Sequence, residues 1–192
     1  MRGGKCHRGR FSSESGFSLL ELVVTLVVAG VLLGVAVPSY LNLSRQNRSS
    51  NESNNFLSLL TLARSEAVKR NGRVVLCKTQ DGNSCSAGGS TGWETGVLVY
   101  FEASTPPNGF TAGTDAIIRA EVPFSPNASI TGNTNVADSI TFLGSGRVAE
   151  VGTLTLKRTE DQKYWRRIKL SNVKGPRICS PAQDSTCTGT DS

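Results

Sequence analysis

The sequence predicts an α+β fold in which one long N-terminal helix packs on antiparallel β-sheets. Positions 17–37 are almost entirely Leu, Val, Ala, Gly and Phe, and apolar residues recur at helical spacing between positions 56 and 68. After Gly72, short β-branched runs alternate with Gly, Pro, Asn and Asp, as strands separated by turns do. We therefore expect a leader at 1–16, a transmembrane segment at 17–43 and one globular domain at 44–192.

The apolar run is long enough to cross a membrane. As a helix rising about 1.5 Å per residue, it covers roughly 30 Å, the thickness of a bilayer core. The leader has a net charge of +3, which comes from Arg2, Lys5, Arg8 and Arg10 against Glu14. Because basic flanks stay in the cytoplasm, we expect the globular domain on the outer side of the inner membrane.

Glu21 is the acidic residue that interrupts this run. A carboxylate inside a membrane costs on the order of 2.5–3.5 kcal/mol on insertion scales, so Glu21 needs a partner. If the chain is cut between Gly16 and Phe17, a new α-amine appears four residues from Glu21. Glu21 of one subunit would then pair with the amine of its neighbour. In a plain membrane anchor, Glu21 would be incidental, and a secretory signal would be cut after the apolar run instead.

The stretch from Gly16 to Leu26 resembles the class III leader of type IV pilins and type II secretion pseudopilins. The resemblance implies that a prepilin peptidase cuts after Gly16 and methylates the amine of Phe17. It also implies that Glu21 serves assembly with other pilin subunits. The protein would then be a single-pass inner-membrane protein with its domain in the periplasm, before it enters a pilus or pseudopilus.

The predicted helix continues to about Arg70, and its second half is amphipathic. Apolar residues recur at every third or fourth position from Phe56 to Val68, and Asn71-Gly72 is a good stop signal. The stretch 45–55 is rich in Ser and Asn, so we expect the helix to loosen there.

The globular domain is predicted to be built from short strands. The strand from 96 to 102 is expected to be buried on both faces, with Trp93 at the edge of the core and Gly96 allowing a close approach. Neighbouring runs alternate apolar and polar residues, as half-buried strands do. The predicted strands are 73–78, 96–102, 116–122, 129–131, 139–143, 146–149, 153–158 and 164–171.

Four cysteines remain once Cys6 leaves with the leader. An even number in an exported domain indicates disulfides, and four cysteines allow three pairings. We favour the two local pairings, Cys77–Cys85 and Cys179–Cys187, because each closes a short polar loop. A zinc site is the alternative, but the mature chain has no histidine and the spacings do not fit a zinc knuckle.

A narrower resemblance appears around the first cysteine pair. Cys77 ends a strand, Cys85 follows a short loop, and Gly92-Trp93-x-x-Gly96 leads into a Val-rich strand. This arrangement resembles the FimT/GspH family of minor pilins and minor pseudopilins. It implies a pilin-like β-sandwich and a structural role in the filament or its tip. The alternative is a type II secretion minor pseudopilin that contacts exported proteins.

The sequence carries no catalytic pattern. The only histidine, His7, lies in the leader, so the mature chain has no Ser-His or Cys-His pair. Metalloprotease, P-loop and EF-hand motifs are absent from the sequence. We expect a protein that is not an enzyme and needs no cofactor or metal.

The segment from 157 to 177 is strongly basic. It holds eight Lys and Arg residues against Glu160 and Asp161, a net charge of +6. In a strand, Trp165, Arg167 and Lys169 would share one face. Such charges can simply protect an edge strand. Alternatively, an aromatic residue beside cations is typical of a nucleic-acid surface.

The resemblance adds a specific hypothesis for this segment. Some FimT-like pilins bind DNA in natural transformation through a motif resembling Gly-Arg-x-Arg near the C-terminus. Aligned on Cys179, Arg177 matches the second arginine, while Gly175 stands at the first and Lys174 precedes it. Double-stranded DNA is therefore a candidate partner. The candidate contact residues are Lys174, Arg177, Arg166, Arg167 and Lys169.

Overall fold

The protein is described from a computed structural model. It describes residues 16–86, 88, 91–104, 109–125, 127–158, 161–172 and 174–187, except for the side chain of Pro38. The chain divides into two compact units, Met1–Leu43 and Ser44–Ser192.

One helix, α1 (Leu19–Arg70), begins in the first unit and continues into the second. At its start, the hydroxyl of Ser18 accepts a hydrogen bond from the backbone N–H of Glu21, which caps the first turn. At its end, Asn71 has φ 47° and the Gly72 N–H donates to the carbonyl of Ala67. This left-handed exit confirms the predicted stop, since Asn tolerates positive φ better than most residues.

The expected loosening of the helix between 45 and 55 is wrong. The helix is continuous there, and the side chains of Ser49 and Ser53 are fully buried. Ser53 donates to the carbonyl of Ser49, while the Glu52 carboxylate pairs with the Arg158 guanidinium. Packing against the domain holds the segment helical, and this contribution exceeds the low helix propensity of Ser and Asn.

The first sheet has four antiparallel strands in the order β3-β2-β1-β5. Its strands are β1 (Arg73–Lys78), β2 (Val97–Glu102), β3 (Ala116–Glu121) and β5 (Ser139–Phe142). As predicted, β2 is buried on both faces. Val97 and Val99 enter the main core, whereas Leu98 and Tyr100 form a smaller cluster on the opposite face with Val75 and Cys77 of β1.

The second sheet is also antiparallel, in the order β4-β6-β7-β8. Its strands are β4 (Ser129–Gly132), β6 (Gly152–Lys157), β7 (Arg166–Leu170) and β8 (Arg177–Cys179). Short 3₁₀ turns lie at Thr134–Val136 (η1) and Gln162–Tyr164 (η2).

Two strand predictions need correction. Residues 146–149 form a turn with a single bridge between Phe142 and Val148, because Gly146 (φ 75°) folds the chain back on itself. The short strand β8 was not predicted, since its three residues are too few to show a period and only pairing with β7 defines them.

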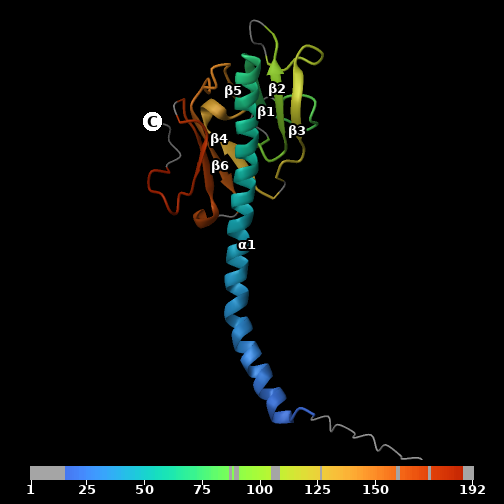
Figure 1. The fold of residues 1–192 in the computed structure, drawn as a ribbon, viewed down its shortest axis with the longest axis vertical. Coiled ribbons are helices and arrows are strands. Elements are labelled where there is room, and N and C mark those ends of the chain that lie inside the picture. Colours follow the sequence, from blue (N-terminus) through green and yellow to red (C-terminus); the bar gives the residue numbers. More distant parts are fainter. Residues whose placement is uncertain are drawn as a thin grey trace, which may run out of the picture. The chain divides into compact units, whose positions relative to one another are not determined.

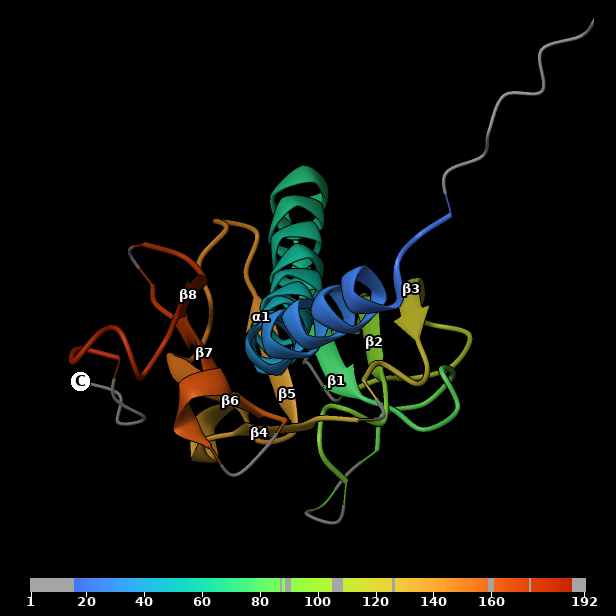
Figure 2. The same ribbon diagram turned by 90° about the horizontal axis from the view of Figure 1, so that it is seen from below.

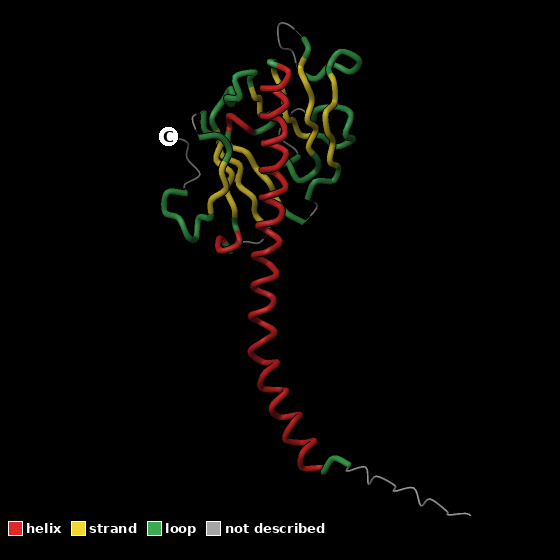
Figure 3. The backbone as a smooth tube through the Cα atoms, viewed as in Figure 1, coloured by secondary structure: helices red, strands yellow, loops and turns green. Residues whose placement is uncertain are grey.

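The second half of α1 packs on the inner faces of both sheets (Figures 1 and 2). Figure 3 shows the same arrangement by element type. The helix contributes a buried stripe to the core: Phe56, Leu59, Leu60, Ala63 and Ala67. This confirms the predicted amphipathic half and the predicted α+β class, in which a helix covers antiparallel sheets.

Trp93 lies inside the core, not at its edge as predicted. Its side chain is fully buried, meets the Phe56 ring edge-on at 5.5 Å and donates from Nε1 to the carbonyl of Val136. Gly96 does allow the expected close approach, because a Cβ there would stand 2.8 Å from the carbonyl oxygen of Thr79.

Candidate functional site

The first candidate site is the apolar start of α1. The exposed fraction of its large side chains is high, for example 83% for Leu19 and 64% for Leu32. This is the one helix in the described residues that is long and apolar enough to cross a membrane. An unbroken apolar helix surface of this length is unfavourable in water, so it requires lipid or other subunits around it.

The predicted processing and assembly residues lie at the beginning of this segment. Gly16 and Phe17 precede the helix, and the Phe17 side chain is 83% exposed. Glu21 lies in the first helical turn and is also exposed. The peptide bond after Gly16 is therefore accessible, and the Glu21 carboxylate is open to a partner from outside the chain.

Both favoured cysteine pairs are joined in the structure. Cys77 and Cys85 are bonded with their Cα atoms 5.6 Å apart, and Cys179 and Cys187 with theirs 5.8 Å apart. Inside the first loop, the Asp81 carboxylate accepts hydrogen bonds from the backbone N–H groups of residues 83 and 84. These bonds lower the pKa of Asp81 to about 2, because they favour its charged form.

The second candidate site is the β7–β8 hairpin, which brings the basic residues together. Lys169 lies directly opposite Arg177, and Arg167 lies opposite Cys179. Arg167 and Lys169 share one face of β7, while Ile168 and Leu170 enter the core from the other. The predicted alternation of β7 is therefore present, and β7 adjoins the C-terminal segment.

Arg166 points toward the helix side of the hairpin. Its guanidinium donates to the carbonyl of Trp165 at 2.9 Å and lies 3.4 Å from the hydroxyls of Ser50 and Ser180. Partial burial lowers the pKa of Arg166. The contact with Ser50 ties α1 to the hairpin, and the Glu52–Arg158 pair ties it to the end of β6, so Arg166 is engaged within the domain.

Arg167 and Lys169 hold the C-terminal disulfide loop. Arg167 donates to the carbonyl of Cys187, and Lys169 donates to the carbonyl of Thr186 at 3.0 Å. Hydrogen bonds from Thr186, with smaller contributions from the nearby cations, lower the pKa of the Asp184 carboxyl. These two basic side chains therefore donate hydrogen bonds to the protein's own backbone.

Lys174 and Arg177 differ from Arg167 and Lys169 in the contacts of their side chains. Both are exposed, and neither side chain has a hydrogen bond or an ion pair within the part of the chain that the structure describes. On β6, the Lys157 ammonium sits 4.4 Å from the centre of the Trp165 ring. Of the five basic residues selected from the sequence, Lys174 and Arg177 are thus the ones open to a ligand.

The sequence analysis missed one basic residue near this hairpin. Arg64 of α1 reaches the turn that contains Gly175, which lies more than a hundred positions later in the chain. It belongs to the amphipathic pattern as an outward-facing charge, so nothing in the sequence distinguishes it. Within the described residues, no three His, Cys, Asp or Glu side chains lie close enough to hold a metal ion.

Comparison with known families decides the class of the protein. A family model described as type II transport protein GspH matches residues 52–173. The chain belongs to the GspH family. A second model, the prokaryotic N-terminal methylation motif, matches residues 11–37. GspH family membership and this motif together make the chain a minor pilin or pseudopilin, a protein that assembles with other pilin subunits after processing by a prepilin peptidase.

Two crystal forms of one solved minor pilin share the fold of this GspH family member. The type IV minor pilin FimU of Pseudomonas aeruginosa PAO1 aligns in one crystal form with a TM-score of 0.52 and 16% identity, covering 70% of this chain and 94% of that one. A second crystal form aligns with a TM-score of 0.50 and 17% identity, covering 75% and 94%. The minor pseudopilin EpsH from the Type 2 Secretion System of Vibrio cholerae aligns with a TM-score of 0.47 and 13% identity, covering 70% and 98%. No curated protein is significantly similar in sequence.

Proposed function

We propose that this chain is a minor pilin of a type IV pilus. The observation that carries the proposal is the exposed apolar helix with its single acid, Glu21, four residues after the Phe17 amine that processing would create. In a helical filament, apolar side chains of neighbouring subunits bury one another. The amine of one subunit neutralises the carboxylate of the next, which removes the cost of an unpaired charge.

Processing and assembly are tested separately. Mass spectrometry of the membrane form should show a chain that starts at Phe17 and carries an N-terminal methyl group, while Gly16→Ala should keep the leader attached. Glu21→Ala should be processed normally but should enter sheared surface pili at a reduced level. A chain cut after residue 37, or normal assembly of Glu21→Ala, would contradict this proposal.

The alternative is a minor pseudopilin of a type II secretion system, which the description of the matching family model favours. In that case the partner would be an exported protein. Deleting the gene separates the two functions. If the deletion strain loses surface pili but secretes normally, the chain is a pilus subunit. If it keeps normal pili but its exported proteins stay inside the cell, the chain is a pseudopilin.

We further propose that the displayed domain binds double-stranded DNA. The observation that favours this function is the exposed pair Lys174 and Arg177, whose side chains have no hydrogen bond or ion pair among the described residues. Cations that contact phosphates displace condensed counterions, so binding should weaken steeply with salt. Phosphate contacts carry no base information, so unrelated sequences should compete almost equally.

Fluorescence anisotropy with a labelled DNA duplex tests this function at several salt concentrations. The double change Lys174→Ala, Arg177→Ala should lower the slope of log affinity against log salt by about two. A matched control, Lys69→Ala with Arg119→Ala, removes the same charge from cations that pair with Glu66 and Glu121. It should leave the slope close to that of the wild type. If the wild type fails to bind at low salt, the DNA proposal is wrong.

A further inference from the structure

Arg64 fills a space between two glycine turns of the domain. Its Nη1 atom lies 2.5 Å from where a Cβ of Gly175 would stand, and its Nε atom lies 3.5 Å from the corresponding point at Gly146. Both glycines have φ near 75°, a conformation that strongly favours glycine. The two turns therefore leave room for a side chain from α1, and the guanidinium of Arg64 covers them from outside.

Further cations flank this position. Lys174 precedes Gly175 and Arg147 follows Gly146, and both are exposed. We call Arg64, Arg147 and Lys174 the turn cluster. It draws one cation each from α1, from the connection after β5 and from the β7–β8 turn. None of the three has an ion pair within the described residues, so the cluster keeps its charge.

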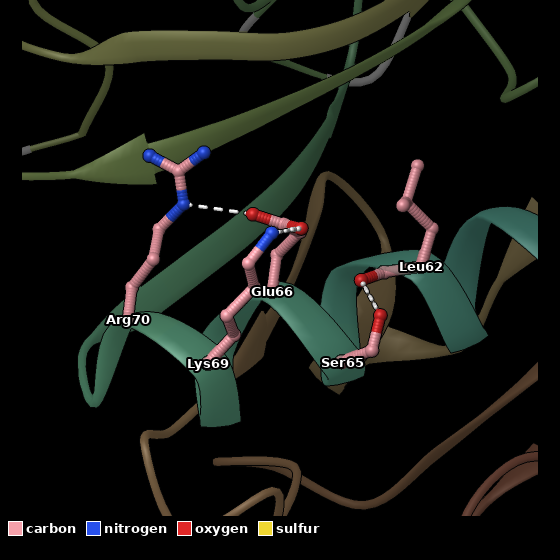
Figure 4. Close-up of polar contacts among 5 residues, drawn as sticks. All are labelled: Leu62, Ser65, Glu66, Lys69 and Arg70. Carbon is pink, nitrogen blue, oxygen red and sulfur yellow. Dashed lines mark hydrogen bonds and ion pairs between the residues drawn. The ribbon is translucent and has the colours of Figure 1, made fainter.

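The end of the same helix provides a contrast. Lys69 and Arg70 both contact the carboxylate of Glu66, at 3.4 and 2.8 Å (Figure 4). The guanidinium of Arg70 also lies over the ring of Phe101, 5.4 Å from its centre. Hydrogen bonding from Arg70 lowers the pKa of Glu66. Cations on this part of α1 are thus neutralised where a partner is present, whereas Arg64 has no such partner within the described residues.

Packing alone does not account for a guanidinium at this place. The stem of Arg64 can cover the two turns, but its planar fork of N–H donors has no hydrogen-bond or ion-pair acceptor among the described residues. An open fork of this kind suits the oxygens of a phosphate group, which it can contact with two parallel hydrogen bonds. The geometry therefore provides a ligand contact in addition to a structural one.

We propose that the turn cluster contacts the phosphate backbone of double-stranded DNA and extends the DNA surface from the hairpin onto α1. This inference rests on the proposed DNA binding, because Lys174 belongs to both surfaces. A lipid headgroup is a poorer match. Arg64 lies 20 positions beyond Ser44, where the domain unit begins, which corresponds to roughly 30 Å of helix.

The test uses the full processed chain, residues 17–192, in a non-ionic detergent. Anisotropy of a labelled duplex is measured over a range of salt for the wild type, Arg64→Ala, Arg64→Gln and Arg64→Lys. Arg70→Ala is the matched control, since it removes the same residue type from the same helix. Thermal melting followed by circular dichroism checks that each variant is folded.

We expect Arg64→Ala and Arg64→Gln each to lower the salt slope by about one, the same change that we expect for Lys174→Ala. Arg64→Lys should retain most of the slope, and Arg70→Ala should not change it. Arg64→Gln keeps part of the stem over the glycine turns, so it remains informative if Arg64→Ala unfolds. Both glutamine and alanine variants should lose affinity equally for unrelated duplex sequences.

Four results would overturn the inference. If Lys174→Ala, Arg177→Ala lowers the slope but the Arg64 variants do not, DNA binding stands and the turn cluster has no part in it. If Arg64→Ala and Arg70→Ala lower it equally, only net charge matters. If vesicles containing phosphatidylglycerol displace the duplex at equal phosphate concentration, the surface is a lipid contact. Absence of wild-type DNA binding refutes the proposed function and this inference together.

Discussion

Replacing Phe56 with alanine should weaken the packing of the second half of α1 against the domain that it covers. The Phe56 side chain is fully buried and packs edge-on against two rings, Trp93 at 5.5 Å and Phe124 at 5.4 Å. It therefore links the helix to residues before and after β3. Removing it leaves a cavity at the point where the helix meets both rings.

The size of the effect follows from this burial. Removing a buried phenylalanine side chain costs about 3–5 kcal/mol of unfolding free energy, which includes the lost transfer free energy and the cavity. Each edge-to-face pair accounts for roughly 0.5–1.5 kcal/mol. We expect a loss of about 4 kcal/mol. For a domain of this size, each kcal/mol lowers Tm by about 2–4 °C, so Tm should fall by roughly 8–16 °C.

Urea denaturation of residues 44–192, followed by circular dichroism with both disulfides intact, measures this loss. The shorter chain is appropriate because every residue of the main core lies within it. Val68→Ala is the control, since Val68 is on the same helix but 52% exposed, and it should change stability by about 0.5 kcal/mol or less. A loss below about 1 kcal/mol for Phe56→Ala would refute the packing of α1 described above.

Three further predictions concern the leader and the first disulfide loop. Replacing Gly16 by a bulkier residue should leave the leader attached, which an intact mass that lacks the new Phe17 terminus would reveal. Replacing Cys77 and Cys85 by alanine should cost about 2.5 kcal/mol in the chain-entropy estimate for a sequence separation of 8, measured by urea denaturation; no loss would show that the loop is held by other contacts. Asp81 has a pKa lowered to about 2, so it stabilises the folded loop above pH 4 and loses this effect as the pH falls from about 4 to 2. The Tm difference between wild type and Asp81→Ala should therefore shrink over that range, and a difference that grows at low pH would contradict the assigned hydrogen bonds.

The sequence was sufficient for features that depend on local pattern. The apolar run, the periodic stripe from Phe56 to Ala67 and the Asn71-Gly72 stop follow from helix geometry and backbone preferences, which act over a few residues. The alternation of β7 is equally local, so its two faces were predicted correctly. The family resemblance followed from spacing around Gly16 and Cys77, and the GspH model and the fold support it.

Features that depend on partners distant in the chain were missed or misplaced. The Ser-rich stretch of α1 stays helical because Glu52 meets Arg158. β8 exists because β7 offers it hydrogen bonds. Trp93 is central because Phe56 closes over it. In each case the deciding contact joins residues at least eight positions apart, and local propensity does not predict it.

Only the tertiary structure decided which basic side chains are left open to a ligand. By itself, the sequence determined that residues 157–177 are strongly basic and that a long apolar helix starts near Phe17. The sequence did not distinguish the Lys and Arg side chains of that segment that are exposed and unpaired among the described residues from those that bond within the domain. The fold separates them, because Arg167 and Lys169 donate to the backbone of the C-terminal loop while Lys174 remains open. The same fold brings Arg64 to Gly175, where its guanidinium occupies the space that a Cβ of this left-handed residue would take.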